Sequence, residues 1–264
     1  MNPTGLVKKR STVVSVALLL CFCWANSAAA QDTDSDKWQF DVSLYGWFTD
    51  IGGTVSHPGG VVPGGPFDVD VSDIIDNLSM VFMGGFEARK NKWSIIGDVI
   101  YLGVGNDKDT FVTSGSGVPV KANVDLDIDA WLLTGGVGYE VVRNDRATLS
   151  VLGGVRYASL EVDTTLGVLR QEAKRSQSEG LVDGIVGLRG VINLHEKWYI
   201  PYYADIGTGD SDLTWQALAG IGYRFASWGD VKLVYRYLKY EMDDDGLLQD
   251  LDVSGPALGV VFRF

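Results

Sequence analysis

Apolar and polar residues alternate with a period of two along most of the chain, a pattern typical of half-buried β-strands. In the segment 78–88 one face carries only apolar residues and glycine, whereas the other includes Ser79 and Glu87. The alternation returns in segments 198–206, 215–225 and 258–264. It predicts about ten strands, near residues 37–50, 77–90, 92–105, 122–142, 146–163, 180–194, 197–208, 212–226, 230–242 and 251–264.

The connections between these segments alternate in length. Tight turns are expected at 90–92, 143–146, 195–196 and 226–229, and mostly longer polar or glycine-rich loops at 51–76, 106–121, 164–179, 209–212 and 243–250. Beyond the N-terminal region, we find no charge-free apolar run long enough for a membrane helix. We therefore predict an all-β, antiparallel, up-and-down transmembrane β-barrel of ten strands, with eight as the alternative. Both termini would lie on the side of the tight turns.

Aromatic residues gather at the strand ends next to the tight turns. Lys-Trp steps open three of the segments, in DKWQF, NKWSI and EKWYI. A Trp ring is apolar while its N–H seeks water, so Trp favours a membrane–water interface. We expect an aromatic girdle there, made of Trp38, Trp93, Trp198, Tyr139, Tyr223 and Phe225.

One strand departs from this scheme. Asp125, Asp127 and Asp129 alternate with apolar residues, so we expect these aspartates to point inward. Continuing the same phase would turn Trp131 inward as well. A β-bulge near Ala130 would correct the phase.

The first thirty residues are typical of a secretory signal peptide. A basic stretch at 8–10 precedes an apolar stretch at 11–23, and alanines at 28–30 provide a cleavage site. We assign residues 1–30 to the signal peptide and 31–264 to the barrel domain. Both cysteines, Cys21 and Cys23, fall in the signal, so the exported domain would need no disulfide. The net charge of −12 disfavours a nucleic-acid partner.

The chain resembles the small, porin-like bacterial outer-membrane β-barrel proteins. The resemblance is carried by the signal peptide, by GGVGYEV (135–141), GGVRYAS (153–159), AGIGYRF (219–225) and YRYLKY (235–240), and by the ending GPALGVVFRF. It implies a location in the outer membrane and contact with the lipid bilayer and lipopolysaccharide. It also implies that Phe262 and Phe264 present a signal to the barrel-assembly machinery. No cofactor is expected.

Charged residues of both signs fall on the polar face of the predicted strands, which would line the barrel lumen. They are Asp41, Glu87, Arg89, Asp98, Arg156, Asp183, Arg189, Asp205, Arg224, Lys232, Arg236 and Arg263. A ten-stranded barrel lies near the size that side chains fill. We expect a charge-paired lumen and a structural or surface-interaction role. The alternative is a narrow channel whose fixed charges select ions or small polar solutes.

Other chemistry has little support in the sequence. His57 and His195 are expected on opposite sides of the membrane, so they would not share a site, and we predict no enzyme. A loop-borne hydrolase using His57 is the second alternative. No metal site is predicted, although Asp243 and Asp245 in the acidic segment 241–252 are weak candidates, and external loops could bind divalent cations. The oligomeric state stays open.

Overall fold

A computed structural model describes residues 37–55, 65–76, 78–113, 119–168, 171–242 and 248–264. The predicted signal peptide lies outside this part. The elements are β1 (Gln39–Trp47), β2 (Asp50–Val55), β3 (Gly65–Val69), α1 (Val71–Asp76), β4 (Leu78–Lys90), β5 (Trp93–Thr113), β6 (Pro119–Arg143), β7 (Ala147–Val168), β8 (Gln171–Asn193), β9 (Trp198–Gly209), β10 (Leu213–Ala226), β11 (Gly229–Glu241) and β12 (Leu248–Arg263). None of its helices is long and apolar enough to cross a membrane.

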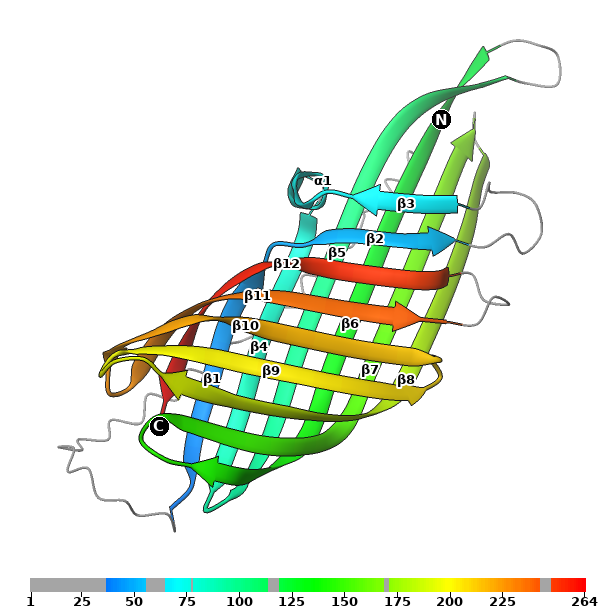
Figure 1. Ribbon diagram of the computed structural model, residues 1–264. Coiled ribbons are helices and arrows are strands. Elements are labelled where there is room, and N and C mark those ends of the chain that lie inside the picture. Colours follow the sequence, from blue (N-terminus) through cyan, green and yellow to red (C-terminus); the bar gives the residue numbers. More distant parts are fainter. Residues whose placement is uncertain (1–36, 56–64, 77, 114–118, 169–170, 243–247) are drawn as a thin grey trace, which may run out of the picture. The chain divides into compact units, whose positions relative to one another are not determined.

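Ten strands form a closed antiparallel ring, in the order β1, β4, β5, β6, β7, β8, β9, β10, β11 and β12 (Figure 1). The first and last strands close it. Asp41 stands opposite Arg263, and Trp47 stands opposite Ala257. Phe40 and Phe264 exchange backbone hydrogen bonds of 3.1 and 2.9 Å at the end of this seam. The prediction of an all-β barrel with ten strands is confirmed, and both ends of the barrel chain meet at the side of the tight turns.

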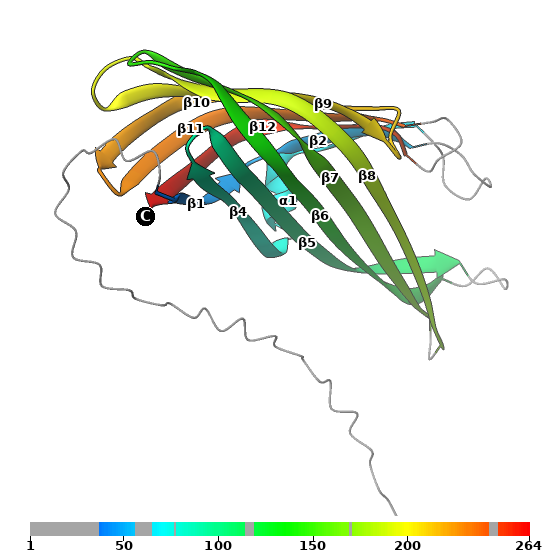
Figure 2. The same cartoon turned by 90° about the horizontal axis from the view of Figure 1, so that it is seen from below.

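Four neighbouring strands, β5 to β8, are longer than predicted (Figure 2). The loops expected at 106–121 and 164–179 are mostly strand, because β5 reaches Thr113 and β7 reaches Val168. Their ladder runs without interruption to the pairs Thr113–Pro119 and Val168–Gln171. The error has a physical cause. Polarity alone does not distinguish a loop from the polar end of a strand, because the backbone pairing that makes a strand does not require apolar side chains.

The predicted β-bulge near Ala130 is absent. β6 keeps one register against β5 from Tyr139 to Pro119, and its only register shift, against β7, lies between Glu140 and Val142. Asp129 is therefore on the same outer face as Trp131, and the expectation that Asp127 and Asp129 point inward is wrong. The side chain of Asp125 lies outside the described part of the structure. The outer face changes character along the strand, from apolar at Trp131 to acidic at Asp129.

The first predicted loop contains β2, β3 and α1. β2 continues β1 along β12 after a bend at Phe48 and Thr49, and β3 folds back on β2. Gly255 permits the bend, because its φ is +157° and a Cβ there would lie 1.9 Å from the backbone oxygen of Phe48. A side chain at this position would force the two backbones apart.

We expect Gly255→Ala to lower the free energy of unfolding by about 1–3 kcal/mol, because the added methyl group overpacks the bend. Urea unfolding of the purified barrel, followed by tryptophan fluorescence, measures the loss. Gly97→Ala is the matched control, since a Cβ at Gly97 meets nothing within 4 Å. Equal stability of the two variants would contradict this account of the bend.

Candidate functional site

The six residues of the predicted girdle all lie on the outer face of the barrel, next to the tight turns. Trp93 and Tyr139 are ladder partners with ring centroids 4.9 Å apart, and Trp198 and Tyr223 are partners at 4.7 Å. Trp38 stacks on Phe40 at 6.2 Å. We call these rings together the turn-side band.

Residues from the turns complete the turn-side band. Trp228, which the sequence analysis missed, makes an edge contact of 5.2 Å with Phe225 and stacks on Phe262 at 6.2 Å. Phe264 is 78% exposed at the end of the seam. The ammonium groups of Lys90 and Lys197 lie 6.0 Å above the rings of Trp38 and Tyr223, respectively. Lysines that lie along apolar rings and keep their charge in water are typical of an interface.

A second set of outer-face aromatic residues, which was not predicted, lies farther along the strands. Tyr101, Trp131 and Trp215 each lie eight residues from an aromatic of the turn-side band, namely Trp93, Tyr139 and Tyr223. The rings of Tyr101 and Trp131 are 4.6 Å apart, and those of Trp215 and Tyr237 are 4.7 Å apart. We call this the far band. The constant spacing of eight residues was present in the sequence as a signal.

The outer face between the two bands carries no charge on the three strands that define both. It consists of Ile95, Gly97 and Val99 on β5, Leu133, Gly135 and Val137 on β6, and Ala217, Ala219 and Ile221 on β10. Eight residues span about 26 Å of strand, or roughly 20 Å along the axis at a tilt of about 40°. Membrane barrels carry an apolar band of about this height between aromatic girdles.

Charged residues return on the outer face beyond the far band. The hydroxyl of Tyr101 donates to Asp129, and that of Tyr237 donates to Asp252. Lys239 pairs with Glu241 at 3.1 Å. The outer face therefore changes from aromatic to charged within about one residue pair of the far band, as expected where hydrocarbon gives way to water.

All twelve predicted lumen charges lie at inner-face positions of the strands, and most are joined to one another. Near the turn-side end, Arg189 of β8 pairs with Glu87 of β4 across the lumen. Arg89 extends this series of ion pairs, at 3.6 Å from Glu87 and 3.4 Å from Asp41. Arg263 lies 3.9 Å from Asp41. One network of alternating charge thus ties β8, β4, β1 and β12 together.

The same network extends to residues that were not among the predicted site residues. Asp230 accepts from Arg263 and from the hydroxyl of Tyr199, the latter at 2.6 Å. Arg224 donates to Asn193 at 2.9 Å and lies 4.5 Å above the ring of Tyr199. Lys232 occupies the inner-face position opposite Gly259. Asp230 was missed because it follows directly on a tight turn, where polarity alone is uninformative.

A second bridge crosses the lumen farther from the turns. Arg236 of β11 pairs with Asp98 of β5 at 3.1 Å, and donates to Gln216 at 2.7 and 3.0 Å. Tyr45 donates to Asp98 at 2.7 Å and accepts from Arg236 at 3.1 Å. We call Arg189–Glu87 and Arg236–Asp98 the cross-lumen bridges, because each joins opposite walls of the ring.

The most deeply buried ion pair lines the wall from β7 to β10. Arg156, which is fully buried, pairs with Asp205 and donates to Thr214 at 3.1 Å. Asp183 stands opposite Arg156 in the ladder and accepts from the backbone N–H of Ser211 at 2.9 Å. These partners replace the water that the charges lose on burial.

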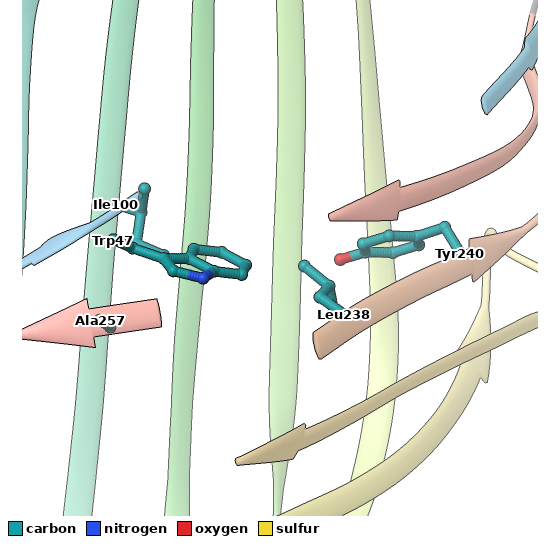
Figure 3. Packing of buried hydrophobic residues seen from close by; sticks show 5 residues of the cluster. All are labelled: Trp47, Ile100, Leu238, Tyr240 and Ala257. Carbon is teal, nitrogen blue, oxygen red and sulfur yellow. The ribbon is translucent and has the colours of Figure 1, made fainter. Parts of the chain in front are cut away.

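Beyond the second bridge the lumen contains an apolar cluster, which was not predicted. Trp47, Ile100, Leu238, Tyr240 and Ala257 point inward from four strands, β1, β5, β11 and β12, and form one buried cluster (Figure 3). The indole of Trp47 donates to the backbone oxygen of Gly255 at 3.2 Å, and the guanidinium of Arg236 lies 4.6 Å above its ring. We call these five residues the lumen cluster. Arg236 connects the lumen cluster to the second cross-lumen bridge, because it contacts Trp47 and pairs with Asp98.

The other predicted chemistry is dispersed. His195 lies in the turn between β8 and β9, where it lines a shallow hollow with Asp145, Asn193, Leu194, Glu196 and Arg224. Among the described residues, no group of three or more His, Cys, Asp or Glu side chains could hold a metal ion. His57, Asp243 and Asp245 lie outside the described residues.

No family of known proteins matches the sequence, and no curated protein matches it. Solved structures of similar fold include the translocator domain of autotransporter NalP from Neisseria meningitidis, at 18% identity over 88% of this chain and 90% of that chain, with a TM-score of 0.45. The outer membrane protease OmpT from Escherichia coli is 10% identical over 90% of this chain and 100% of that chain, with a TM-score of 0.45. The attachment invasion locus protein Ail of Yersinia pestis is 14% identical over 86% of this chain and 99% of that chain, with a TM-score of 0.37. Likenesses this distant assign no activity to the chain.

We expect Arg156→Ala to lower the free energy of unfolding by about 3–5 kcal/mol, because it leaves Asp205 buried without its cation. Arg156→Met combined with Asp205→Leu should recover most of the loss, since it removes both charges. Urea unfolding measures each variant. Arg143→Ala is the control, with an expected loss of about 0–1 kcal/mol, because Arg143 is half-exposed in its pair with Glu140. A loss as small as that of the control would contradict the proposed burial of the pair.

Proposed function

We propose that this protein is an integral barrel of the bacterial outer membrane, with a lumen closed to solutes and a structural or surface-interaction role. The observation that carries the proposal is the filling of the lumen. The two cross-lumen bridges occupy the turn-side half, and the lumen cluster occupies the space beyond them. A solute would have to break both layers to pass.

The membrane location rests on the outer face. A charge-free surface between two aromatic bands, with charges directly beyond the far band, is what a barrel needs in a bilayer. Val186, for example, is 62% exposed on the outer face, in the apolar surface between the bands, which we call the belt. In water, a belt of such residues around the whole barrel would favour aggregation.

The orientation follows from the unequal ends. Short turns and both chain ends belong at the periplasmic side, as expected after export by a cleaved signal peptide. The long extensions of β5 to β8 would then project from the cell surface, where they support a role in surface contacts. Lipopolysaccharide is the expected neighbour there, and divalent cations could bridge its phosphates to carboxylates of the external loops.

Two further parts of the proposal concern assembly and catalysis. Phe262 and Phe264, on the last strand of the ring, would be read by the barrel-assembly machinery. We propose no enzymatic role, cofactor or nucleic-acid partner. Among the described residues the one histidine, His195, lies at the periplasmic turns, in a shallow hollow without a nucleophile beside it.

Val186→Arg tests the location. A charge near the middle of the belt should lower the free energy of unfolding in lipid bilayers by about 2–4 kcal/mol. Ser178→Arg is the matched control, since Ser178 is exposed on the same face of β8 but beyond the belt, and little change is expected. A soluble barrel would tolerate both substitutions alike, which would overturn the membrane location.

Planar-bilayer recording tests the closed lumen. We expect the purified, refolded protein to give no steady conductance, and Arg189→Ala to remain silent, because the Arg236–Asp98 bridge and the lumen cluster still fill the path. Heat-modifiable gel mobility confirms that each sample is a folded barrel. A steady conductance whose ion selectivity changes in Arg189→Ala or Arg156→Ala would instead favour the narrow channel.

A further inference from the structure

Arg224 is the exception among the inner-face arginines. The other members of this set each pair with at least one carboxylate, namely Arg89, Arg156, Arg189, Arg236 and Arg263. Within the described residues, Arg224 forms no such pair. In a barrel that supplies an acid to its other inward arginines, Arg224 is available for an anion from outside the chain.

Neutral groups hold the guanidinium of Arg224 in place. It lies 4.5 Å above the ring of Tyr199, and its Nη2 donates to Oδ1 of Asn193 at 2.9 Å. Asn193 is itself fixed, because its Nδ2 donates to the backbone oxygen of Asp145 at 3.0 Å. A planar guanidinium oriented in this way is pre-organised to receive an anionic group.

Arg224 lines the hollow at the tight turns, which we call the turn-side hollow. Its volume is about 320 Å³, and its other lining residues are Asp145, Asn193, Leu194, His195 and Glu196. These residues come from two neighbouring turns, β6–β7 and β8–β9, which a backbone hydrogen bond of 2.7 Å from Asn193 to Arg146 joins. The volume lies at the lower end of the range for small-molecule sites, which begins at roughly 300 Å³.

The charges of the turn-side hollow favour a ligand that carries both signs. Arg224 contributes one positive charge, and Asp145 and Glu196 contribute two negative charges. Neither carboxylate is ion-paired within the part of the chain that the structure describes, and both residues are exposed. Two carboxylates would repel an anion alone, and Arg224 would repel a cation alone. An ammonium joined to an anionic group avoids both penalties.

The turn-side hollow lies beside the turn-side band. Tyr223 immediately precedes Arg224, and its ring contacts Trp198 of the band at 4.7 Å. Leu194, which lines the hollow, is 55% exposed, and Ile192 on the outer face of β8 is 43% exposed. Apolar surface therefore leads from the hollow to the belt. In the proposed orientation, the hollow lies at the headgroup level of the periplasmic leaflet.

We propose that the turn-side hollow binds the phosphoethanolamine headgroup of a phospholipid of the periplasmic leaflet. Arg224 receives the phosphate, Asp145 and Glu196 receive the ammonium, and the acyl chains run from Leu194 along the outer face of β8. This inference rests on the proposed membrane location. The ammonium distinguishes this lipid from phosphatidylglycerol, which has no positive charge, and from phosphatidylcholine, whose methylated ammonium donates no N–H hydrogen bond.

Native mass spectrometry of the refolded barrel in detergent micelles tests the site. The protein is titrated with phosphatidylethanolamine, phosphatidylcholine or phosphatidylglycerol of identical acyl chains, and the lipid retained per barrel is counted. We expect one molecule of phosphatidylethanolamine to bind several-fold more tightly than either of the other lipids. Equilibrium dialysis with free O-phosphoethanolamine tests for a soluble ligand, and flotation with lipid vesicles tests the membrane location independently.

Arg224→Gln should abolish the preference for phosphatidylethanolamine, because the phosphate loses its charged partner. Asp145→Asn combined with Glu196→Gln should also remove it, and should raise the binding of phosphatidylglycerol, since the hollow then carries a net positive charge. Arg143→Gln is the matched control, because Arg143 is half-exposed beside the same turn as Asp145 but does not line the hollow. It should leave the preference unchanged. Heat-modifiable mobility verifies the fold of every variant.

The contrary outcomes are distinct. Equal retention of the three lipids by the unaltered barrel would show that the hollow is ordinary turn surface, and an unchanged preference in both hollow variants would place the lipid elsewhere. Binding of free O-phosphoethanolamine without a preference for the lipid would assign the hollow to a soluble ligand. Each result overturns the lipid proposal. A barrel that fails to float with vesicles would instead overturn the proposed location itself.

Discussion

The pairing of every strand with two neighbours is the constraint on which the rest of this structure depends. Hydrocarbon offers no partner for a peptide group, so an open sheet edge in a bilayer costs several kcal/mol for each unpaired group. The seam between β1 and β12 removes both edges of the ring at once. Once the ring is closed, successive side chains must point alternately to lipid and to the lumen, and the period of two in the sequence follows directly.

Closure also decides what the lumen must contain. A ten-stranded barrel lies near the size that side chains fill, so inward charges need partners on the facing wall. Arg189 reaches Glu87, and Arg236 reaches Asp98, each across the ring. Such pairs repay only part of their desolvation cost, but they fix which walls face one another. The lumen cluster adds apolar packing on the side of Arg236 that lies away from the tight turns.

The sequence predicts the features that depend on local pattern. Alternation and turn spacing locate all ten strands to within a few residues in most cases, and place twelve charges on the inner face. They do not predict partners such as Arg236 and Asp98, which are 138 residues apart, because those depend on the curvature and stagger of the ring. The polar ends of β5 to β8 were mistaken for loops.

The seam joins strands whose paired residues, such as Asp41 and Arg263, are more than two hundred positions apart. Apart from β1 with β4, whose paired residues are 40 to 50 positions apart, every other pairing of the ring joins strands that are consecutive along the chain. Such a distant contact carries a large loop-closure entropy and forms slowly unless the intervening hairpins have shortened the loop. The barrel can therefore form one hairpin after another, while the edge of β1 that will face β12 stays unpaired until β12 has formed. Its slowest folding step is the one that joins its beginning to its end.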